Sequence, residues 1–165
     1  MIEIEKPRIS IEELDESGLY GKFVVEPLEA GFGITIGNSL RRVLLSSLPG
    51  AAVSFINIRG VEHEFDTIPG VLEDVPEIVL NIKSIVLKMT EDEPVKLVIE
   101  KKGKGEIKAS DIELVPHVSI INPDQHIATL NDDADFYLEM MVEKGRGYEP
   151  SELKKDEITE IGIIP

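Results

Sequence analysis

The chain has 165 residues, 32 of them acidic and 17 of them lysine or arginine, which gives a formal net charge of −15 at pH 7. Its 42% hydrophobic residues suffice for a folded core in one domain or two small ones. The absence of cysteine excludes disulfides, thiolate metal sites and a cysteine nucleophile. No apolar run approaches the ~20 residues of a membrane span, and the first residues do not resemble a signal peptide. The acidic excess disfavours charge-driven nucleic-acid binding, so a cytoplasmic protein that touches no membrane is expected.

The first two predicted elements are strands. Residues 7–14 and 19–26 are extended runs on either side of the turn 15–18, which contains a glycine. This arrangement predicts a β-hairpin that ends at Pro27.

The charge distribution then changes, because no acidic residue lies between Glu29 and Glu62. This window carries only Arg41, Arg42 and Arg59, a local charge of +3. Such a stretch in an acidic protein indicates either a buried element or a partner surface. Two adjacent arginines are seldom buried without partners, but both interpretations stay open at this point.

A helix is predicted over 33–48, entered through glycines, with Thr35 as a possible N-cap and Pro49-Gly50 as its end. At about 100° per residue, five apolar side chains share one face, which we expect to be the core side. These are Ile36, Leu40, Val43, Leu44 and Leu48. Leu45 lies opposite them, bracketed by the two arginines, as suits an interface. A helix buried on both sides within its own domain is the alternative.

The periodicity after Ala51 indicates a β-rich second unit, with a boundary near Pro49-Gly50. Helical spacing recurs at Leu72, Val75, Ile78, Val79 and Ile82, although Pro76 forbids a regular helix before about that residue. The predicted strands are 53–59, 84–89, 95–100, 118–121 and 136–142.

No motif for catalysis or metal binding stands out. His63, His117 and His126 lack a histidine partner at metal-ligand spacing, which favours isolated structural or surface roles. The acidic turn of Asp132, Asp133 and Asp135 lacks the spacing of a calcium-binding EF-hand loop.

Two segments allow more than one interpretation. The glycine-rich stretch 31–37 is not a phosphate-binding motif of either common pattern, and close backbone packing with a sharp turn into the helix is the favoured explanation. The basic segment 144–148 (Lys-Gly-Arg-Gly-Tyr) is expected to form a loop that touches a phosphate or anchors a protein partner. By composition and motif alone, the chain is a soluble, non-catalytic α+β protein with an arginine-leucine helix face available to a partner.

The run from Glu26 to Val53 closely resembles the amino-terminal domain of bacterial RNA polymerase alpha subunits. Further matches are 70–75 (Gly-Val-Leu-Glu-Asp-Val), 78–83 (Ile-Val-Leu-Asn-Ile-Lys) and 144–148. The likeness extends, in order, through essentially the whole chain.

The resemblance implies a partial alpha-subunit dimerisation domain with an inserted β-rich second domain. Residues 1–49 would form the first part of the dimerisation domain, and 50–165 the inserted domain, whose last few residues return toward the first. The chain stops where family members complete that first domain, so part of a subunit is expected. The carboxy-terminal domain that binds promoter DNA would be absent, and no direct DNA contact is expected from this segment.

The resemblance also implies a function, as a non-catalytic assembly scaffold of the DNA-directed RNA polymerase, a nucleotidyltransferase complex that performs transcription. Alpha subunits form homodimers and recruit the beta and beta-prime subunits. Arg42 and Leu45 match the family's beta-subunit contact, and Glu77 and Lys83 match positions implicated in binding the large subunits. The helix with the apolar stripe would be the dimer helix.

No catalytic residue, cofactor or metal is expected, and the protein would act in the cytoplasm as part of the nucleoid-associated polymerase. The alternative is a small-molecule or nucleotide-binding enzyme that uses the glycine-rich turn 31–37.

Overall fold

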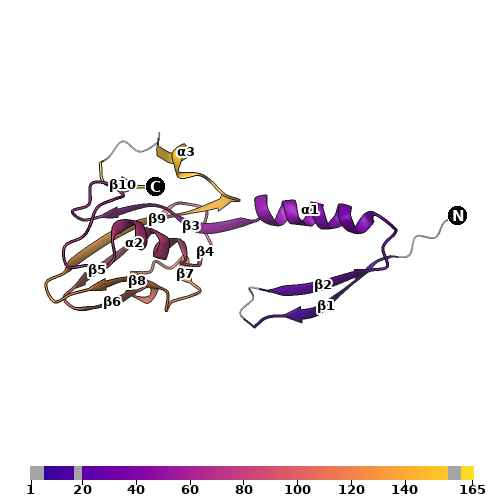
Figure 1. Cartoon of the computed structure of the whole chain (residues 1–165), viewed down its shortest axis with the longest axis horizontal. Helices are drawn as coiled ribbons and strands as arrows, with labels where there is room; N and C mark the ends of the chain where they lie inside the picture. Colours follow the sequence, from indigo (N-terminus) through magenta and orange to yellow (C-terminus); the bar gives the residue numbers. More distant parts are fainter. Residues whose placement is uncertain (1–5, 17–19, 156–160) are drawn as a thin grey trace. The chain divides into compact units, whose positions relative to one another are not determined.

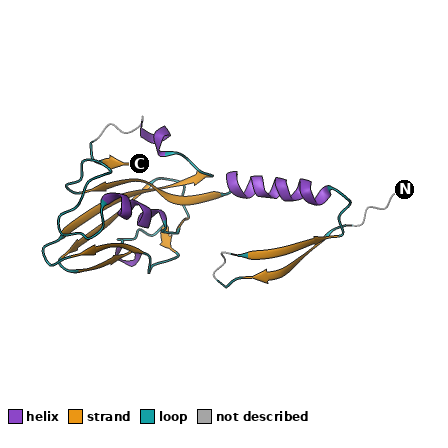
Figure 2. Cartoon of the chain, in the orientation of Figure 1, coloured by secondary structure: helices purple, strands orange, loops and turns teal. Residues whose placement is uncertain are grey.

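A computed structural model describes residues 6–16, 20–155 and 161–165. The chain divides into two compact units, Met1–Ser46 and Ser47–Pro165. Its described secondary structure is mostly β with three α-helices (Figure 2).

The first unit begins with the predicted hairpin. Strands β1 (Arg8–Leu14) and β2 (Gly21–Glu26) pair antiparallel, with a register shift between Ile11 and Glu13. Part of the predicted turn, residues 17 and 18, lies outside the described residues. The hairpin prediction is confirmed.

Helix α1 (Phe32–Ser46) follows. It begins earlier than predicted, so Thr35 lies inside the helix and is not its N-cap. The hydroxyl of Ser39 donates to the carbonyl oxygen of Thr35 at 2.8 Å, a bond between successive helical turns. The helix also ends at Ser46, so Leu48 lies beyond it.

The second unit is built on a six-stranded antiparallel sheet, which Figure 1 shows with its labels. Its strand order is β5-β9-β3-β4-β7, and β10 also pairs with β3. These strands are β3 (Pro49–Ile58), β4 (Leu87–Met89), β5 (Val95–Lys102), β7 (Val118–Ile120), β9 (Asp135–Arg146) and β10 (Ile163–Ile164). A separate two-stranded sheet joins β6 (Gly105–Lys108) to β8 (His126–Leu130). The remaining elements are α2 (Val75–Lys83), the 3-10 helix η1 (Ala109–Asp111) and α3 (Ser151–Lys155).

The core of the second unit follows from alternation along its strands. In β9 every second side chain is buried, and in β5 the buried side chains are Leu97 and Ile99. The buried members of β9 are Phe136, Leu138, Met140 and Val142. These side chains belong to one buried apolar cluster that also includes residues of α2, and their burial stabilises the unit.

Helix α2 presents Val75, Ile78 and Ile82 to this core. It begins at Val75 because Pro76, which has no N–H to donate, is tolerated in the first turn. Leu72, which shares the helical spacing, lies before the helix and is 81% exposed. The helix therefore begins where Pro76 was expected to limit it, and Leu72 shares the spacing without being helical.

Two further corrections concern the β elements. The strand predicted over 53–59 begins at Pro49, so the proposed boundary residues Pro49 and Gly50 belong to β3. The expected loop 144–148 is a strand over its first three residues, because Lys144 and Arg146 pair with Ala51 and Pro49.

Candidate subunit-contact surfaces

Helix α1 has no buried residue. Leu40, Val43 and Leu44, predicted to pack on the core side, are about half exposed or more, and Ile36 is partly covered. The expectation that this stripe is sealed within its own unit was therefore wrong. The cause is that the hairpin does not cover the helix, and the described part of the first unit offers no other element that could.

Arg42 and Leu45 lie on the other side of α1, about 60° apart around the helix axis. Both side chains are exposed, and Leu45 has 65% of its surface accessible. The structure therefore leaves both faces of α1 open. The alternative of a helix buried on both sides within its own domain finds no support in the described part of the first unit.

The hairpin also has an uncovered apolar face. Cross-strand pairing sets Ile9 opposite Val25 and Ile11 opposite Phe23, so these four side chains share one side of the two-stranded sheet. Ile9, Ile11 and Phe23 are each more than half exposed. The other side carries polar pairs such as Lys22 with Glu12, whose charged atoms lie 2.6 Å apart.

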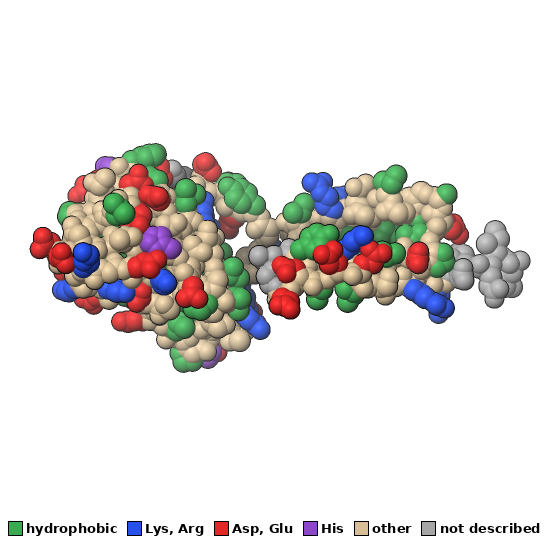
Figure 3. Space-filling view, turned by 60° about the horizontal axis from the view of Figure 1, so that its bottom comes forward, with side chains coloured by type: hydrophobic (Ala, Val, Ile, Leu, Met, Phe, Trp, Pro, Cys, Tyr) green, Lys and Arg blue, Asp and Glu red, His purple; other side chains and the backbone are tan. Residues whose placement is uncertain are grey.

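The first unit therefore has amphipathic elements without a core of its own. None of its described residues, from Lys6 to Ser46, is buried, and Figure 3 shows hydrophobic side chains at its surface. A two-stranded hairpin and a single helix gain most of their stability in water by packing on something else. Contiguous exposed apolar surface of this kind marks a protein-protein contact.

The glycines of 31–37 do not form a ligand loop. Gly31 precedes the helix with φ of 89°, a conformation that favours glycine, but Gly33 and Gly37 lie inside α1. A Cβ at any of the three would meet nothing within 4 Å. Close packing within the described chain is therefore wrong as their explanation, and the nucleotide-binding alternative gains no support.

In the second unit, α2 turns Glu77 and Lys83 outward. Asp74 caps the helix, since its side chain accepts a hydrogen bond from the N–H of Glu77 at 2.9 Å. Leu80 lies between the two charged residues on the outer face and is 64% exposed. The structure thus places Glu77 and Lys83 on one helix face of the second unit, whereas Arg42 and Leu45 belong to the first.

A polar cluster fixes the segment before α2. Glu73 is 8% exposed and is the one charged residue among the buried ones described. Its carboxylate accepts hydrogen bonds from the N–H of Thr129 at 2.6 Å and from the Thr129 hydroxyl at 2.9 Å. Nε2 of His126 lies 2.9 Å from Glu73, and Nδ1 of the same ring lies 2.9 Å from Glu106.

The electrostatics of the cluster favour its charged form. Burial raises the pKa of Glu73, but hydrogen bonds from Thr129 and His126 outweigh it and leave that pKa below its usual value. Partial burial lowers the pKa of His126, but the hydrogen bonds and charges of Glu73 and Glu106 leave it raised. The cluster ties α2 to β8, as does the side-chain amide of Asn81, which donates to the carbonyl oxygen of Ile127 at 3.0 Å.

Sequence inspection missed this cluster, because its members are scattered along the chain and each is an ordinary residue alone. His126, expected in a structural or surface role without a histidine partner, is paired with two carboxylates. His117 lies 3.0 Å from Glu91, and His63 lies 3.9 Å from Asp66. Asp135, assigned to the acidic turn from the sequence, is the first residue of β9 and pairs with Lys102 and Arg59.

Within the described residues, no group of three or more histidine or carboxylate side chains could hold a metal ion. None of the helices there has the length and hydrophobicity needed to cross a membrane.

The apolar faces left open on α1 and on the hairpin are typical of a protein-protein contact surface. Residues 56–165 match the family model described as the RNA polymerase Rpb3/RpoA insert domain, and the chain belongs to this family.

Two curated relatives extend the likeness to the whole chain. It is 58% identical over all 165 residues to the DNA-directed RNA polymerase subunit alpha of Desulforudis audaxviator (strain MP104C). It is 52% identical over the same residues to the subunit of that name from Oceanobacillus iheyensis. The chain covers 52% of each relative, about half its length.

Proposed function

We propose that this chain is the amino-terminal part of an RNA polymerase alpha subunit and acts as an assembly scaffold. In this role it dimerises with a second copy and recruits the beta and beta-prime subunits for DNA-templated transcription. The names of the relatives, DNA-directed RNA polymerase subunit alpha, support the assignment. It works in the cytoplasm, within the nucleoid-associated polymerase, and has no catalytic site of its own.

The observation that carries the proposal is that no residue in the described part of the first unit, 6–16 and 20–46, is buried. A dimerisation domain whose first part is residues 1–49 accounts for it, because its apolar faces are completed by a second copy and by other chain segments. In the same scheme residues 50–165 form the inserted domain. The start of the family match at residue 56 supports that division.

The two faces of α1 suit two different partners. The apolar stripe, with Leu40 and Leu44 at its centre, suits a second copy of the helix, since homodimer interfaces are rich in apolar surface. Arg42 and Leu45 suit the beta subunit, because arginine is a frequent anchor of interfaces and Leu45 is an apolar side chain beside it. Glu77 and Lys83 on α2 provide a further contact for a large subunit.

The beta-subunit contact is tested by capture of purified beta on immobilised full-length alpha. Arg42→Ala and Leu45→Ala should each weaken capture by about tenfold or more, since loss of a central anchor costs on the order of 2 kcal/mol. Lys104→Ala, in an exposed turn of the second unit, and Leu153→Ala, whose side chain is as exposed as that of Leu45, are matched controls. Unchanged capture by the Arg42→Ala, Leu45→Ala double variant rules out this contact.

Dimerisation is tested separately by the mass of the full-length subunit from light scattering. Leu44→Asp should shift the mass from dimer toward monomer, because a carboxylate cannot be buried unpaired in an apolar interface. A dimer mass that Leu44→Asp leaves unchanged at micromolar concentration would remove α1 from the dimer contact.

A further inference from the structure

The pairing of β3 with β9 joins two parts of the sequence with unusual charge. Ala51 pairs with Lys144 and Pro49 pairs with Arg146. The β3 residues belong to the window without acidic residues, and the β9 residues belong to the basic segment 144–148. The fold thereby sets Lys144 and Arg146 of β9 beside an uncharged stretch of β3, in a chain whose net charge is −15.

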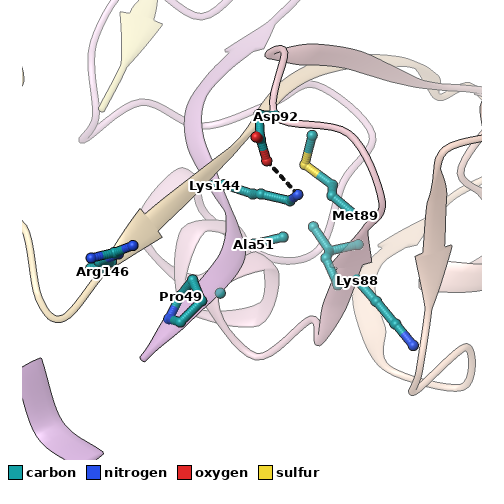
Figure 4. A pocket seen from close by; sticks show the side chains of 9 residues that line it. Pro49, Ala51, Lys88, Met89, Asp92, Lys144 and Arg146 are labelled. Carbon is teal, nitrogen blue, oxygen red and sulfur yellow. Dashed lines mark hydrogen bonds and ion pairs between the residues drawn. The ribbon is translucent and has the colours of Figure 1, made fainter. Parts of the chain in front are cut away.

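A pocket of about 500 Å³ opens at this end of the sheet, within the second unit (Figure 4). Residues from β3, β4 and β9, together with one from the loop after β4, line it. They are Pro49, Gly50, Ala51, Leu87, Lys88, Met89, Asp92, Lys144 and Arg146. The lining combines an apolar floor, to which Ala51 and Met89 contribute, with charged groups of predominantly positive sign.

The charged groups of the pocket differ in how they are engaged. Nζ of Lys144 lies 2.6 Å from Oδ1 of Asp92, a carboxylate whose side chain is 92% exposed. Arg146 is exposed, and no ion pair joins it to any carboxylate that the structure describes. In Figure 4 the ammonium of Lys88 points away from the Lys144–Asp92 pair. Arg146 is therefore a cation at this pocket that no described carboxylate neutralises, and it is available to an incoming group.

We propose that this pocket, which we call the β3–β9 pocket, binds an acidic segment of a partner protein, with Arg146 as its anchor. A carboxylate of the partner pairs with the guanidinium of Arg146, and a neighbouring apolar side chain lies on Ala51 and Met89. A second carboxylate displaces Asp92 from Lys144. Asp92 thus acts as an internal competitor that neutralises the lysine until the partner arrives.

The residues around the β3–β9 pocket favour a protein, rather than a nucleic acid, as the bound partner. Neutralising a phosphate backbone takes many cations, and the charge excess here is local and small. Tyr148, two residues beyond Arg146, is 85% exposed. Arginine and tyrosine are the residues most enriched among the energetic centres of protein interfaces, and methionine is enriched there too.

This inference rests on the proposed function, because the partner is taken to be a large polymerase subunit. The test uses full-length alpha and measures capture of purified beta and beta-prime, with polyglutamate as competitor. Arg146→Ala should weaken capture by about 30-fold, the factor expected for an arginine at an energetic centre of an interface. Lys104→Ala, which removes the same charge from an exposed turn, should leave capture unchanged.

A second variant is expected to strengthen capture. A folding defect could not explain such a gain. Asp92→Asn removes the competitor and should strengthen capture by up to about fivefold, the factor that matches an exposed ion pair. Polyglutamate should compete with wild-type alpha and lose its effect in Arg146→Ala.

The outcomes separate this inference from the scaffold proposal. If Arg42→Ala weakens capture but Arg146→Ala and Asp92→Asn do not change it, the scaffold stands and the β3–β9 pocket has no such role. If Arg146→Ala alone changes capture, the pocket stands and the α1 contact fails. Failure of polyglutamate to compete, or a loss of duplex DNA binding in Arg146→Ala with capture intact, overturns the acidic-protein assignment.

Discussion

The imidazole of His126 links two carboxylates, with Nε2 2.9 Å from Glu73 and Nδ1 2.9 Å from Glu106. Ionised carboxylates only accept hydrogen bonds, so both ring nitrogens donate when the ring carries its second proton. The doubly protonated ring therefore joins the segment before α2 to both strands of the β6–β8 sheet.

This cluster predicts a pH-dependent contribution to stability. Because the folded pKa of His126 is raised, its contribution is complete below the unfolded value of 6.5 and is lost as the pH rises through the folded pKa. Because the folded pKa of Glu73 is lowered, its contribution is present above 4.5 and is lost as the pH falls through the folded pKa. The destabilisation caused by His126→Gln, measured by urea unfolding, should thus be larger near pH ~5.5 than near pH ~8.5.

His117→Gln is the control for that measurement. His117 meets one carboxylate, that of Glu91, and both side chains are about half exposed, so solvent screens the pair. Equal pH dependence in the two variants would show that the cluster around His126 contributes nothing specific.

Removal of the buried carboxylate should be more costly than removal of the ring. Glu73→Ala leaves the N–H and hydroxyl of Thr129 without their acceptor and should lower the free energy of unfolding by about 2–3 kcal/mol. Glu152→Ala, at the exposed start of α3, should change it by less than about 0.5 kcal/mol. Comparable losses in the two variants would contradict a structural role for Glu73.

Two leucines should respond very differently to truncation. Leu138→Ala empties a fully buried position in β9 and should cost about 2–5 kcal/mol. Leu45→Ala, on a residue 65% exposed in the isolated chain, should cost less than about 0.5 kcal/mol in the monomer. Thermal or urea unfolding of both variants measures this, and a large loss for Leu45→Ala would mean that the helix face is covered within its own protomer.

Gly70 and Gly60 have similar backbone conformations but different surroundings, so alanine substitutions at the two positions can be compared. Both have φ near +80°, so alanine is strained at either position by about 1–2 kcal/mol. A Cβ at Gly60 would meet nothing within 4 Å, whereas at Gly70 it would lie 2.8 Å from Oδ1 of Asn131 and 2.9 Å from Cα of Ala134. Gly70→Ala should therefore lower the melting temperature more than Gly60→Ala, and equal losses would show that the loop around Asn131 yields freely.

The contribution of the α2 N-cap, Asp74, to the free energy of unfolding can also be measured. Asp74→Ala removes the acceptor for the N–H of Glu77 and should cost about 1 kcal/mol, while Asp74→Asn keeps most of the stability. Asp124→Ala, at an exposed position in the loop before β8, is the control. If Asp74→Ala lowers the free energy of unfolding no more than Asp124→Ala does, the N-cap does not stabilise α2.

The sequence anticipated elements whose side chains alternate or recur with a clear period. The hairpin, α1, α2 and the alternating strand β9 were all predicted, with boundaries that shifted by a few residues. Strand β8 was missed because Ile127 and Ala128 are adjacent and both buried, which breaks the two-residue period. Strand β6 was missed because its four residues include a single buried hydrophobic side chain, Ile107.

For the candidate contact surfaces, prediction from the sequence was limited in a different way. Periodicity correctly separated Leu45 from the apolar stripe of α1, but it could not reveal that the stripe itself is uncovered, since burial depends on what lies against the helix. The β3–β9 pocket and the cluster around His126 arise from pairing between distant segments. Spacing along the chain carries no information on such juxtapositions.

The pairing of Ile56 with Ile164 has a consequence for the evolution of the second unit. The matched family segment runs from residue 56 to 165, so its two ends lie on neighbouring strands of the same sheet. A module whose two ends lie close together can be inserted into a surface loop of another protein without separating the parts of that protein's fold. Transplantation of a segment that begins at Pro49, and so keeps the residue Ala51 that pairs with Leu87 of β4, should therefore leave its strand order intact.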